Sequence, residues 1–175
     1  MINTMADARA FAAACKYPPM GERSWGSYGG LSASGLDQNG YLKESNRFSL
    51  SFAMIETREA MAILDDILAL DGIDAVFVGP SDLSIALSGG AYVDATTKEV
   101  DDAIAHIVAR ANAAKKPVAI YAQSAERAKA FLAMGAKLVT VMSDTVFLRA
   151  AAQTALKVTR SSDRPGFRRR RPRAP

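Results

Sequence analysis

The sequence predicts an α/β fold in which helices cover parallel strands. Short apolar segments alternate with amphipathic segments from residue 47 to residue 158. The apolar segments are too uniformly hydrophobic for a sheet with one face in water, which is typical of buried parallel strands. The chain has 175 residues, enough for about five βα units, whereas a complete (β/α)8 barrel needs about 250 residues. A partial barrel of about four to five units and a complete doubly wound sheet of five strands both agree with this length.

Hydrophobic periodicity gives the individual elements. The predicted strands are 47–55, 73–79, 117–122 and 137–143. The helices predicted to follow them are 57–70, 98–114, 124–136 and 144–158. Thr57 is placed to cap the first of these helices, and Gly135 is placed at the C-terminal end of the third. At the start of the chain, residues 1–4 resemble the end of a further strand, and residues 5–15 the helix after it.

Residues 18–47 form the longest segment without such periodicity, and we expect an irregular structure there. The segment is rich in glycine, but it contains neither a GxGxxG pattern nor a Walker pattern. It is therefore not predicted to bind a nucleotide.

The charge of the chain is unevenly distributed. The net charge is +4, but residues 160–175 alone contain seven Arg and one Asp, so that residues 1–159 have a net charge of −2. The 160–175 segment has three prolines and no apolar periodicity, and we expect a disordered, Arg-rich tail after a domain formed by residues 1–159. Its only aromatic residue is Phe167 and no nucleic-acid-binding fold is recognisable, so a nucleic-acid partner is not predicted.

The cysteine count and the distribution of apolar residues indicate in which compartment the protein is expected. Cys15 is the only cysteine, so no intramolecular disulfide forms, and we expect a small buried side chain there. No apolar run reaches the 18 residues typical of a membrane-spanning helix. Asp7 and Arg9 interrupt the segment in which a signal peptide would be apolar. The sequence therefore predicts a cytoplasmic protein without membrane contact.

Two carboxylates stand at equivalent places after neighbouring predicted strands. Glu56 ends the first strand and Asp82 follows the second, 26 residues later. Parallel neighbours would place both at the carboxyl edge of the sheet, where barrels and open sheets alike bind their ligands. Carboxylate, water and ligand oxygens suit Mg²⁺ or Mn²⁺, with Co²⁺ as a further candidate. The alternative is that both acids merely stabilise the helix N-termini that follow them.

The turn before Asp82 has a second expected function. Pro80 restricts Gly79 and presets the first helical turn, and the amides of Ser81 and Asp82 would then face outward at a helix N-terminus. Unpaired N–H groups at such a terminus favour an anion. A small carboxylate could dock there, with Gly79, Pro80, Ser81 and Asp82 as its binding residues.

These motifs carry a resemblance to a known family. The segment MIETREAMAILDDILALDGIDAVFVGPSDLSIALS resembles the core of the HpcH/HpaI aldolases, a family of metal-dependent class II pyruvate aldolases. KYPPMGERSWG and GAKLVTVMSDTVFLRAA are similar to other parts of that family, so that the likeness covers roughly residues 1–158. It implies a (β/α)8 barrel, Glu56 and Asp82 as metal ligands, and a homo-oligomer in the full-length parent. Arg23 falls on the Pro-Pro-x-Gly-x-Arg segment, which implies a contribution to the substrate site.

The resemblance also implies a reaction. A divalent cation that binds the keto and carboxylate oxygens of a 2-oxo acid acts as a Lewis acid for retro-aldol cleavage of a 4-hydroxy-2-oxo acid to pyruvate and an aldehyde. The family's catalytic His motif and its substrate Arg motif are both absent from this chain, so that we expect the chain alone to be weak or inactive. Met54 stands where some members have Gln, which leaves the substrate open.

Several alternatives remain at this point. His106 lies within a predicted helix beside Asp102, and we expect a surface residue there, not a substitute base. A Schiff-base mechanism would need a lysine at the mouth, but Lys116 and Lys137 precede their strands and the other six lie in loops or helices. A citrate-lyase β-like enzyme acting on a CoA thioester and a non-catalytic oligomerising remnant are the alternative functions.

Overall fold

The computed structural model describes residues 1–160, and the chain divides into two compact units, Met1–Val141 and a second that begins at Met142. The first unit holds four strands: β1 (Phe52–Ile55), β2 (Ala75–Val78), β3 (Val118–Ala122) and β4 (Leu138–Val141). Its helices are α1 (Met5–Cys15), α2 (Tyr28–Ser34), α3 (Gln38–Phe48), α4 (Arg58–Ala62), α5 (Leu64–Leu68), α6 (Pro80–Leu87), α7 (Lys98–Ala113) and α8 (Ala125–Met134). The second unit contains α9 (Asp144–Arg160).

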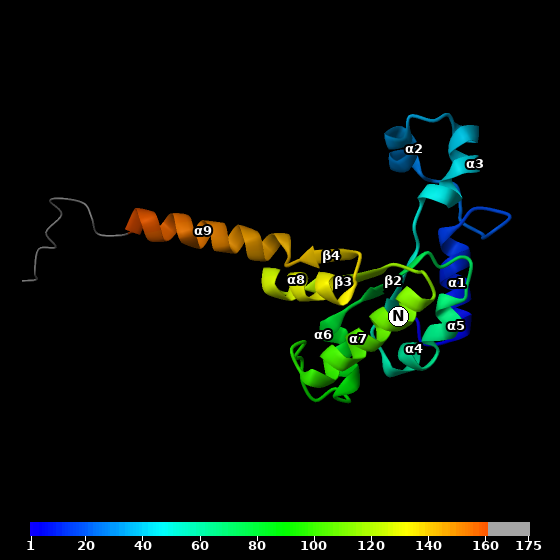
Figure 1. The fold of residues 1–175 in the computed structure, drawn as a ribbon. Helices are drawn as coiled ribbons and strands as arrows, with labels where there is room; N and C mark the ends of the chain where they lie inside the picture. The colour runs from blue at the N-terminus through cyan, green and yellow to red at the C-terminus, as the bar shows by residue number, and fades with distance from the viewer. Residues whose placement is uncertain (161–175) are drawn as a thin grey trace, which may run out of the picture. The chain divides into compact units, whose positions relative to one another are not determined.

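All four strands are parallel and lie in the order β1-β2-β3-β4 (Figure 1). Each is followed by at least one helix, so that the predicted α/β class and the four βα units are confirmed. The strand order decides between the two alternatives left open by the length. A doubly wound sheet reverses its strand order at a switch point, whereas the strands of a barrel follow one another in sequence. The sheet therefore has the topology of part of a (β/α)8 barrel.

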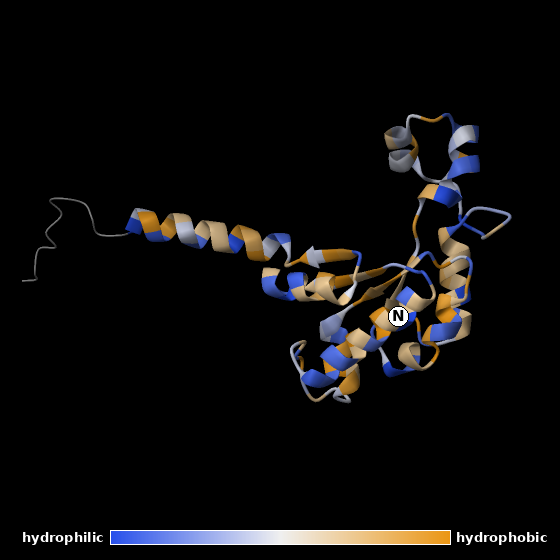
Figure 2. Cartoon of the chain, in the orientation of Figure 1, coloured by the Kyte–Doolittle hydropathy of each residue, from blue (hydrophilic) through white to orange (hydrophobic). Residues whose placement is uncertain are grey.

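The core lies between the sheet and the helices that cover one of its faces. Helix α7 packs against β2 and β3, and α8 packs against β3 and β4. The predicted apolar face of α7 is buried as expected, and it consists of Val100, Ile104, Ile107, Val108 and Ala111. Figure 2 shows both hydrophilic and hydrophobic stretches along α7, as expected for an amphipathic helix. Burial of this face fixes the helix on the sheet.

The start of the chain differs from the prediction in one respect. Residues 1–4 form no strand; Ile2 is buried in the core, and Asn3 accepts a hydrogen bond from the Thr57 hydroxyl through its side chain at 2.7 Å. Thr4 caps α1 by accepting a hydrogen bond from the Asp7 amide, so that the chain enters α1 directly after Asn3. The predicted helix 5–15 is confirmed as α1.

Residues 18–47 are not irregular as predicted, because they contain α2 and most of α3. Asp37 caps α3 by accepting a hydrogen bond from the Gly40 amide at 2.7 Å. Tyr41 is buried and contacts the edges of Trp25 and Phe48. The apolar residues that hold this segment are aromatic and widely spaced, so that no helical periodicity reveals them in the sequence.

The first predicted strand is too long, and the first predicted helix is divided. Arg47 and Phe48 belong to α3, so β1 begins only at Phe52. The helix predicted at 57–70 breaks at Ile63, which leaves the helical conformation with φ −113° and ψ 20°. The predicted cap is confirmed, since the Thr57 hydroxyl accepts a hydrogen bond from the Ala60 amide at 3.1 Å.

An ion pair between a buried lysine and a partly exposed aspartate joins α1 to the amino edge of the sheet. Lys16, of which only 1% of the side chain is exposed, donates from Nζ to Asp74 Oδ2 at 2.6 Å. The same ammonium donates to the carbonyls of Asn46 and Ser49 at the end of α3. Asp74 Oδ2 also accepts hydrogen bonds from the amide and hydroxyl of Ser51. Since Ser51 precedes β1 and Asp74 precedes β2, this cluster fixes the starts of two neighbouring strands to α1 and α3.

Helix α8 ends at Gly135 as predicted, and this position gives a first test of the fold. Gly135 is left-handed, with φ 116°, and a Cβ there would approach Asn112 Nδ2 to 2.9 Å. We expect Gly135→Ala to lower the free energy of unfolding by about 1–2 kcal/mol, because the left-handed conformation is unfavourable for alanine. Gly29→Ala is the matched control, since nothing lies within 4 Å of that added Cβ inside α2. Urea unfolding of both variants measures the difference, and equal effects would contradict this account of the helix end.

The second unit is described by itself. Helix α9 includes Arg160, the first residue of the predicted tail, and none of the residues Asp144–Arg160 is buried. Residues 161–175, which make up the rest of the predicted Arg-rich tail, lie outside the described residues. Within residues 1–160, no helix combines the length and the hydrophobicity needed to cross a membrane.

Candidate functional site

The two carboxylates identified in the sequence converge at the carboxyl edge of the sheet. Glu56 directly follows β1, and Asp82 lies in the first turn of α6, which follows β2. A Cβ added to Gly79 would lie 3.1 Å from Glu56 Oε2 and 3.4 Å from Asp82 Oδ2. Both oxygens therefore lie around the same point, and the missing side chain of Gly79 leaves space between them. The structure brings Glu56 and Asp82 together as the sequence predicts.

The electrostatic environment of Glu56 is unfavourable for an isolated negative charge. Only 7% of the residue is exposed. Burial raises the pKa of its carboxyl group, and the negative charge of Asp82 raises it further, against a smaller opposing effect of the N-terminal ammonium. A positive ion between the two carboxylates would relieve both effects, because it would replace lost hydration and neutralise the repulsion.

A cavity of about 300 Å³ opens beside this pair. It is lined by Met54 of β1, Phe77 of β2, Tyr121 just before the end of β3, and the turn formed by Gly79, Pro80, Ser81 and Asp82. Met54 and Phe77 are partners in the β1–β2 register. These three strand residues are only half-buried, whereas their neighbours along the strands lie in the core. The cavity therefore lies on the sheet face opposite the helices, with an apolar floor and a polar rim.

The turn at Gly79 positions the polar rim. Pro80 is the first residue of α6, where its lack of an amide hydrogen costs nothing. The first helical hydrogen bond runs from the Leu83 amide to the Gly79 carbonyl at 2.9 Å. The amides of Ser81 and Asp82 therefore precede the hydrogen-bonded part of the helix, in the position where helix N-termini attract anions. The predicted anion-binding turn thus forms part of the cavity wall.

Arg58 is a site-supporting residue that the sequence reasoning missed. It lies two residues after Glu56, and its guanidinium donates to the carbonyls of Ala86 and Leu87 at the C-terminal end of α6. It also lies 3.5 Å from Glu99 of α7. The positive charge at the negative end of the helix is stabilising. Arg58 thus ties the segment that carries Glu56 to the helix that carries Asp82; only its position within the ETREA motif could have indicated this.

The donor chemistry of the site fits a hard divalent cation. Glu56 and Asp82 are oxygen donors, and a Mg²⁺ or Mn²⁺ ion accepts two carboxylates together with water or ligand oxygens. Within residues 1–160, no group of three or more His, Cys, Asp or Glu side chains is arranged to hold a metal. The pair would therefore supply two ligands, and a bound cation would keep coordination positions open for a substrate.

Arg23 lies in a different environment from the other predicted site residues. Its guanidinium stacks on the Tyr17 ring, 5.0 Å from the ring centre, and donates to Ser27 Oγ at 2.9 Å. Its backbone amide donates to the Lys16 carbonyl at the C-terminal end of α1. Arg23 is not among the residues that line the cavity. The structure does not bring it to Glu56 and Asp82, and its predicted substrate contact stays a prediction.

The side chains considered as alternatives lie away from the cavity. Lys116 precedes β3 and donates from Nζ to the carbonyls of Leu70 and Ile73, both at 2.6 Å. Burial lowers its pKa, but this lysine is at the amino edge of the sheet, as predicted. Lys137 likewise precedes β4, and His106 is exposed on α7. Asp102 pairs with Lys98, not with His106. Cys15 is half-buried, whereas the sequence predicted a buried side chain.

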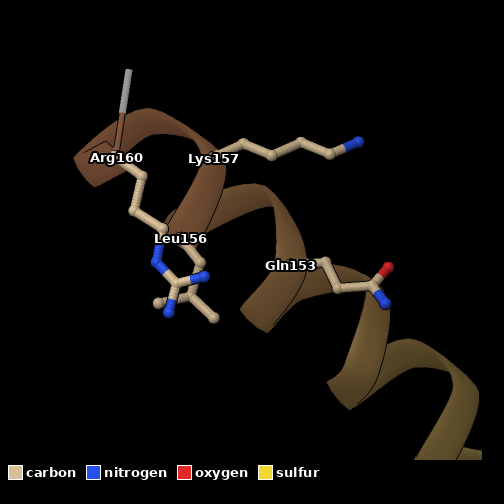
Figure 3. Close-up of a pocket in the computed structure, with 4 residues that line it drawn as sticks. All are labelled: Gln153, Leu156, Lys157 and Arg160. Carbon is tan, nitrogen blue, oxygen red and sulfur yellow. The ribbon is translucent and has the colours of Figure 1, made fainter. Parts of the chain in front are cut away.

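A larger hollow of about 580 Å³ belongs to α9 alone. It is lined by Gln153, Leu156, Lys157 and Arg160 (Figure 3). Figure 3 shows Arg160 beside Leu156, whereas Lys157 extends away from them. Among the described residues, no second element forms a wall here, and the side chains do not converge on a common point. The smaller cavity at the sheet edge is therefore the candidate site.

Sequential parallel strands with a carboxylate pair and a small cavity at their carboxyl edge define a site of the α/β-barrel enzyme class. The chain belongs to the HpcH/HpaI aldolase/citrate lyase family, which its residues 1–151 match. A hydroxypyruvate/pyruvate aldolase from Rhizorhabdus wittichii is 42% identical over 161 residues, which are 92% of this chain and 63% of that protein. A 4-hydroxy-2-oxo-heptane-1,7-dioate aldolase from Salmonella arizonae is 38% identical over 87% of this chain and 57% of its own length.

The solved structures agree with the assignment. An HpcH/HpaI aldolase/citrate lyase family protein from Burkholderia cenocepacia superposes with a TM-score of 0.78 at 28% sequence identity. The match covers 92% of this chain and 63% of that chain. This chain therefore spans less than two thirds of the length of the relatives that it matches. The family resemblance and the fold class predicted from the sequence are confirmed.

Proposed function

We propose that this chain carries the cation- and anion-binding part of a carbon–carbon lyase that cleaves a 4-hydroxy-2-oxo acid to pyruvate and an aldehyde. The observation that carries the proposal is the convergence of Glu56 and Asp82 around Gly79, beside a turn suited to an anion. Membership of an aldolase/citrate lyase family supports lyase chemistry, and the relatives named above are aldolases. The cavity of about 300 Å³ suits a small acid.

The residues of the site have separate roles in this proposal. Glu56 and Asp82 would hold a Mg²⁺, Mn²⁺ or Co²⁺ ion, which when bound supplies positive charge for stabilising the anion that develops as the carbon–carbon bond breaks. The amides of Ser81 and Asp82 bind and orient the substrate carboxylate. Met54, Phe77 and Tyr121 form the apolar floor, which limits the water around the reacting atoms.

A general base for the 4-hydroxyl proton is not evident among the described residues. The only histidine is His106, which is exposed on α7 and does not line the cavity. Lys116 is held by two carbonyls at the opposite edge of the sheet. We therefore propose that cleavage needs a base beyond residues 1–160, and that the chain alone binds ligands but turns over slowly or not at all.

Calorimetric titration of Mn²⁺ into the full 175-residue chain tests the proposal. We expect Glu56→Gln and Asp82→Asn each to weaken Mn²⁺ binding by at least about 100-fold, since even residues that only support metal ligands cost about 10- to 100-fold. Glu59→Gln is the matched control, because Glu59 is an exposed carboxylate only three residues from Glu56. Pyruvate should strengthen Mn²⁺ binding to the unmodified chain. Equal Mn²⁺ affinity of all four proteins would overturn the cation site.

A CoA-thioester lyase remains the second candidate, because the family description includes citrate lyase. The same titration distinguishes the two functions. An aldolase site should bind pyruvate in the presence of Mn²⁺ and give no response to acetyl-CoA. A thioester lyase should bind the CoA ester more tightly than the free acid, since its cavity would have to accept the larger ligand. Binding of neither ligand, in a soluble chain without Mn²⁺ affinity, would favour the non-catalytic alternative.

A further inference from the structure

Gln123 occupies a position at the candidate site that no motif explains. It follows β3 directly, so that it lies at the same carboxyl edge as Glu56 and Asp82. Its Nε2 donates to Ser81 Oγ at 3.4 Å. Its Oε1 is buried and has no hydrogen-bond partner among the described residues. Buried polar atoms are nearly always paired, and exceptions concentrate at functional sites.

The contact determines what the Ser81 hydroxyl can do. A hydroxyl group has one hydrogen to donate and two lone pairs with which to accept. Because Gln123 donates to Ser81 Oγ, the Ser81 hydrogen is not used in this contact, and the Ser81 hydroxyl donates no hydrogen bond to another residue within residues 1–160. Ser81 lines the cavity. Its hydroxyl is therefore a free donor on the cavity wall, polarised by the amide that donates to it.

Other contacts of the turn hold the backbone of Ser81 in place. Ser84 donates from its hydroxyl to the Ser81 carbonyl at 2.6 Å, which fixes the backbone of Ser81. The Asp94 amide in turn donates to Ser84 Oγ at 3.1 Å and joins this turn to the next loop. With the backbone held in this way, the freedom left to Ser81 is its side-chain rotation. Gln123 limits that rotation from the neighbouring strand.

We propose that Gln123 is a positioning residue that directs the Ser81 hydroxyl toward the carboxylate of a 2-oxo acid in the cavity, an inference that rests on the proposed function. The carboxylate then accepts a hydrogen bond from the Ser81 hydroxyl in addition to those from the first-turn amides of α6. Glu56 and Asp82 repel the ligand carboxylate, and hydrogen bonds from neutral donors help to offset this repulsion. The arrangement selects ligands whose carboxylate adjoins the keto oxygen.

A purely structural role predicts a different response to substitution. If Gln123 only filled space between β3 and α6, Gln123→Met would preserve function as long as the chain folded. As a positioning residue, Gln123 can be replaced by Met without loss of thermal stability, because the substitution also removes a buried oxygen that has no partner. The same substitution weakens carboxylate binding, because it releases the Ser81 side chain.

Pyruvate titration of the full chain at saturating Mn²⁺ tests the inference with four variants: Ser81→Ala, Gln123→Met, Gln123→Glu and the double variant Ser81→Ala/Gln123→Met. We expect Gln123→Met to weaken pyruvate binding about ten-fold, the size of a hydrogen bond to a charged group, with Mn²⁺ affinity unchanged and Tm unchanged or raised. Gln123→Glu should weaken binding further, because a carboxylate accepts the Ser81 hydrogen and adds negative charge. The double variant should bind no more weakly than Ser81→Ala, because both substitutions remove the same interaction.

The outcomes separate this inference from the proposed function. Pyruvate binding by Gln123→Met equal to that of the unmodified chain would overturn the role of Gln123 and leave the proposed function intact. Independent losses that multiply in the double variant would also overturn it. An unmodified chain that binds Mn²⁺ but not pyruvate would overturn the proposed function together with this inference. If Gln123→Met fails to fold, Gln123→Glu and Ser81→Ala are used instead. If both of these variants bind pyruvate as tightly as the unmodified chain, the inference is overturned.

Discussion

Gly79→Ala should weaken Mn²⁺ binding by at least about ten-fold, which corresponds to about 1.4 kcal/mol. The added Cβ would lie 3.1 Å from Glu56 Oε2, which must therefore shift by a few tenths of an ångström, and 3.4 Å from Asp82 Oδ2, so that it occupies the space between the two carboxylates. The backbone of Gly79 has φ −100° and ψ 93°, a conformation that alanine adopts readily. The expected effect is therefore a loss of affinity with little change in Tm. Calorimetry and thermal unfolding of the same sample measure both quantities.

Gly26→Ala is the control for this substitution. Nothing lies within 4 Å of a Cβ at Gly26. We expect its Mn²⁺ affinity to equal that of the unmodified chain. A Gly79→Ala variant that keeps full affinity would show that the space between the two carboxylates has no part in cation binding, whatever the effect of changing the carboxylates themselves.

Asp74→Asn should lower the free energy of unfolding by about 3–5 kcal/mol, because it leaves the ammonium of Lys16 buried without an opposite charge. Only 1% of the Lys16 side chain is exposed, and its remaining partners are two neutral carbonyls. Adding Lys16→Met to this variant should restore part of the loss, since the double variant no longer contains a buried charge. Urea unfolding at neutral pH measures the three proteins.

The exposed pair Lys98–Asp102 provides the comparison. Its side chains are 85% and 65% exposed, at a similar separation of 2.6 Å. Asp102→Asn should change the free energy of unfolding by less than about 0.5 kcal/mol, because water screens the pair. Similar effects of Asp74→Asn and Asp102→Asn would contradict the role assigned to burial.

The same ion pair predicts a pH dependence with a definite sign. Burial alone raises the pKa of Asp74, but hydrogen bonds from Lys16 and Ser51 outweigh it and hold the pKa below the ordinary value of 3.8. A carboxyl group with a lowered pKa stabilises the folded state above its unfolded pKa, and this contribution disappears as the pH falls through the folded value. The stability difference between the unmodified chain and Asp74→Asn should therefore be constant at neutral pH and shrink below pH 3.8.

The repeating part of the fold could be predicted because its signal is local. Strands such as 117–122 and helices such as 98–114 bury one continuous apolar set, which appears directly as periodicity. The segment that contains α3 could not be predicted in this way. Its order depends on Tyr41 against Trp25 and Phe48, and on Lys16 reaching the Asn46 and Ser49 carbonyls, which are contacts between distant residues. Single-sequence periodicity contains no record of such contacts.

The candidate site, too, could be predicted only in part from the sequence. Glu56 and Asp82 could be paired because the carboxyl ends of parallel strands share an edge, and the turn at Gly79 could be interpreted from its proline. Arg58 and Gln123 could not, since their importance depends on which atoms their side chains reach. Arg23 shows the opposite case, because a motif position alone does not place a side chain at the cavity.

The sheet separates its two charged clusters by the full length of the strands. Lys16 and Asp74 lie before β1 and β2, and Glu56 and Asp82 lie after them, with no shared hydrogen-bond partner among the described residues. Substitutions at distant sites without common partners change free energies additively. Substitutions at the amino edge should therefore change the free energy of unfolding without changing the ligand affinity of the site at the carboxyl edge. The parallel sheet in this way gives the protein two independently adjustable properties, one at each end of the same strands.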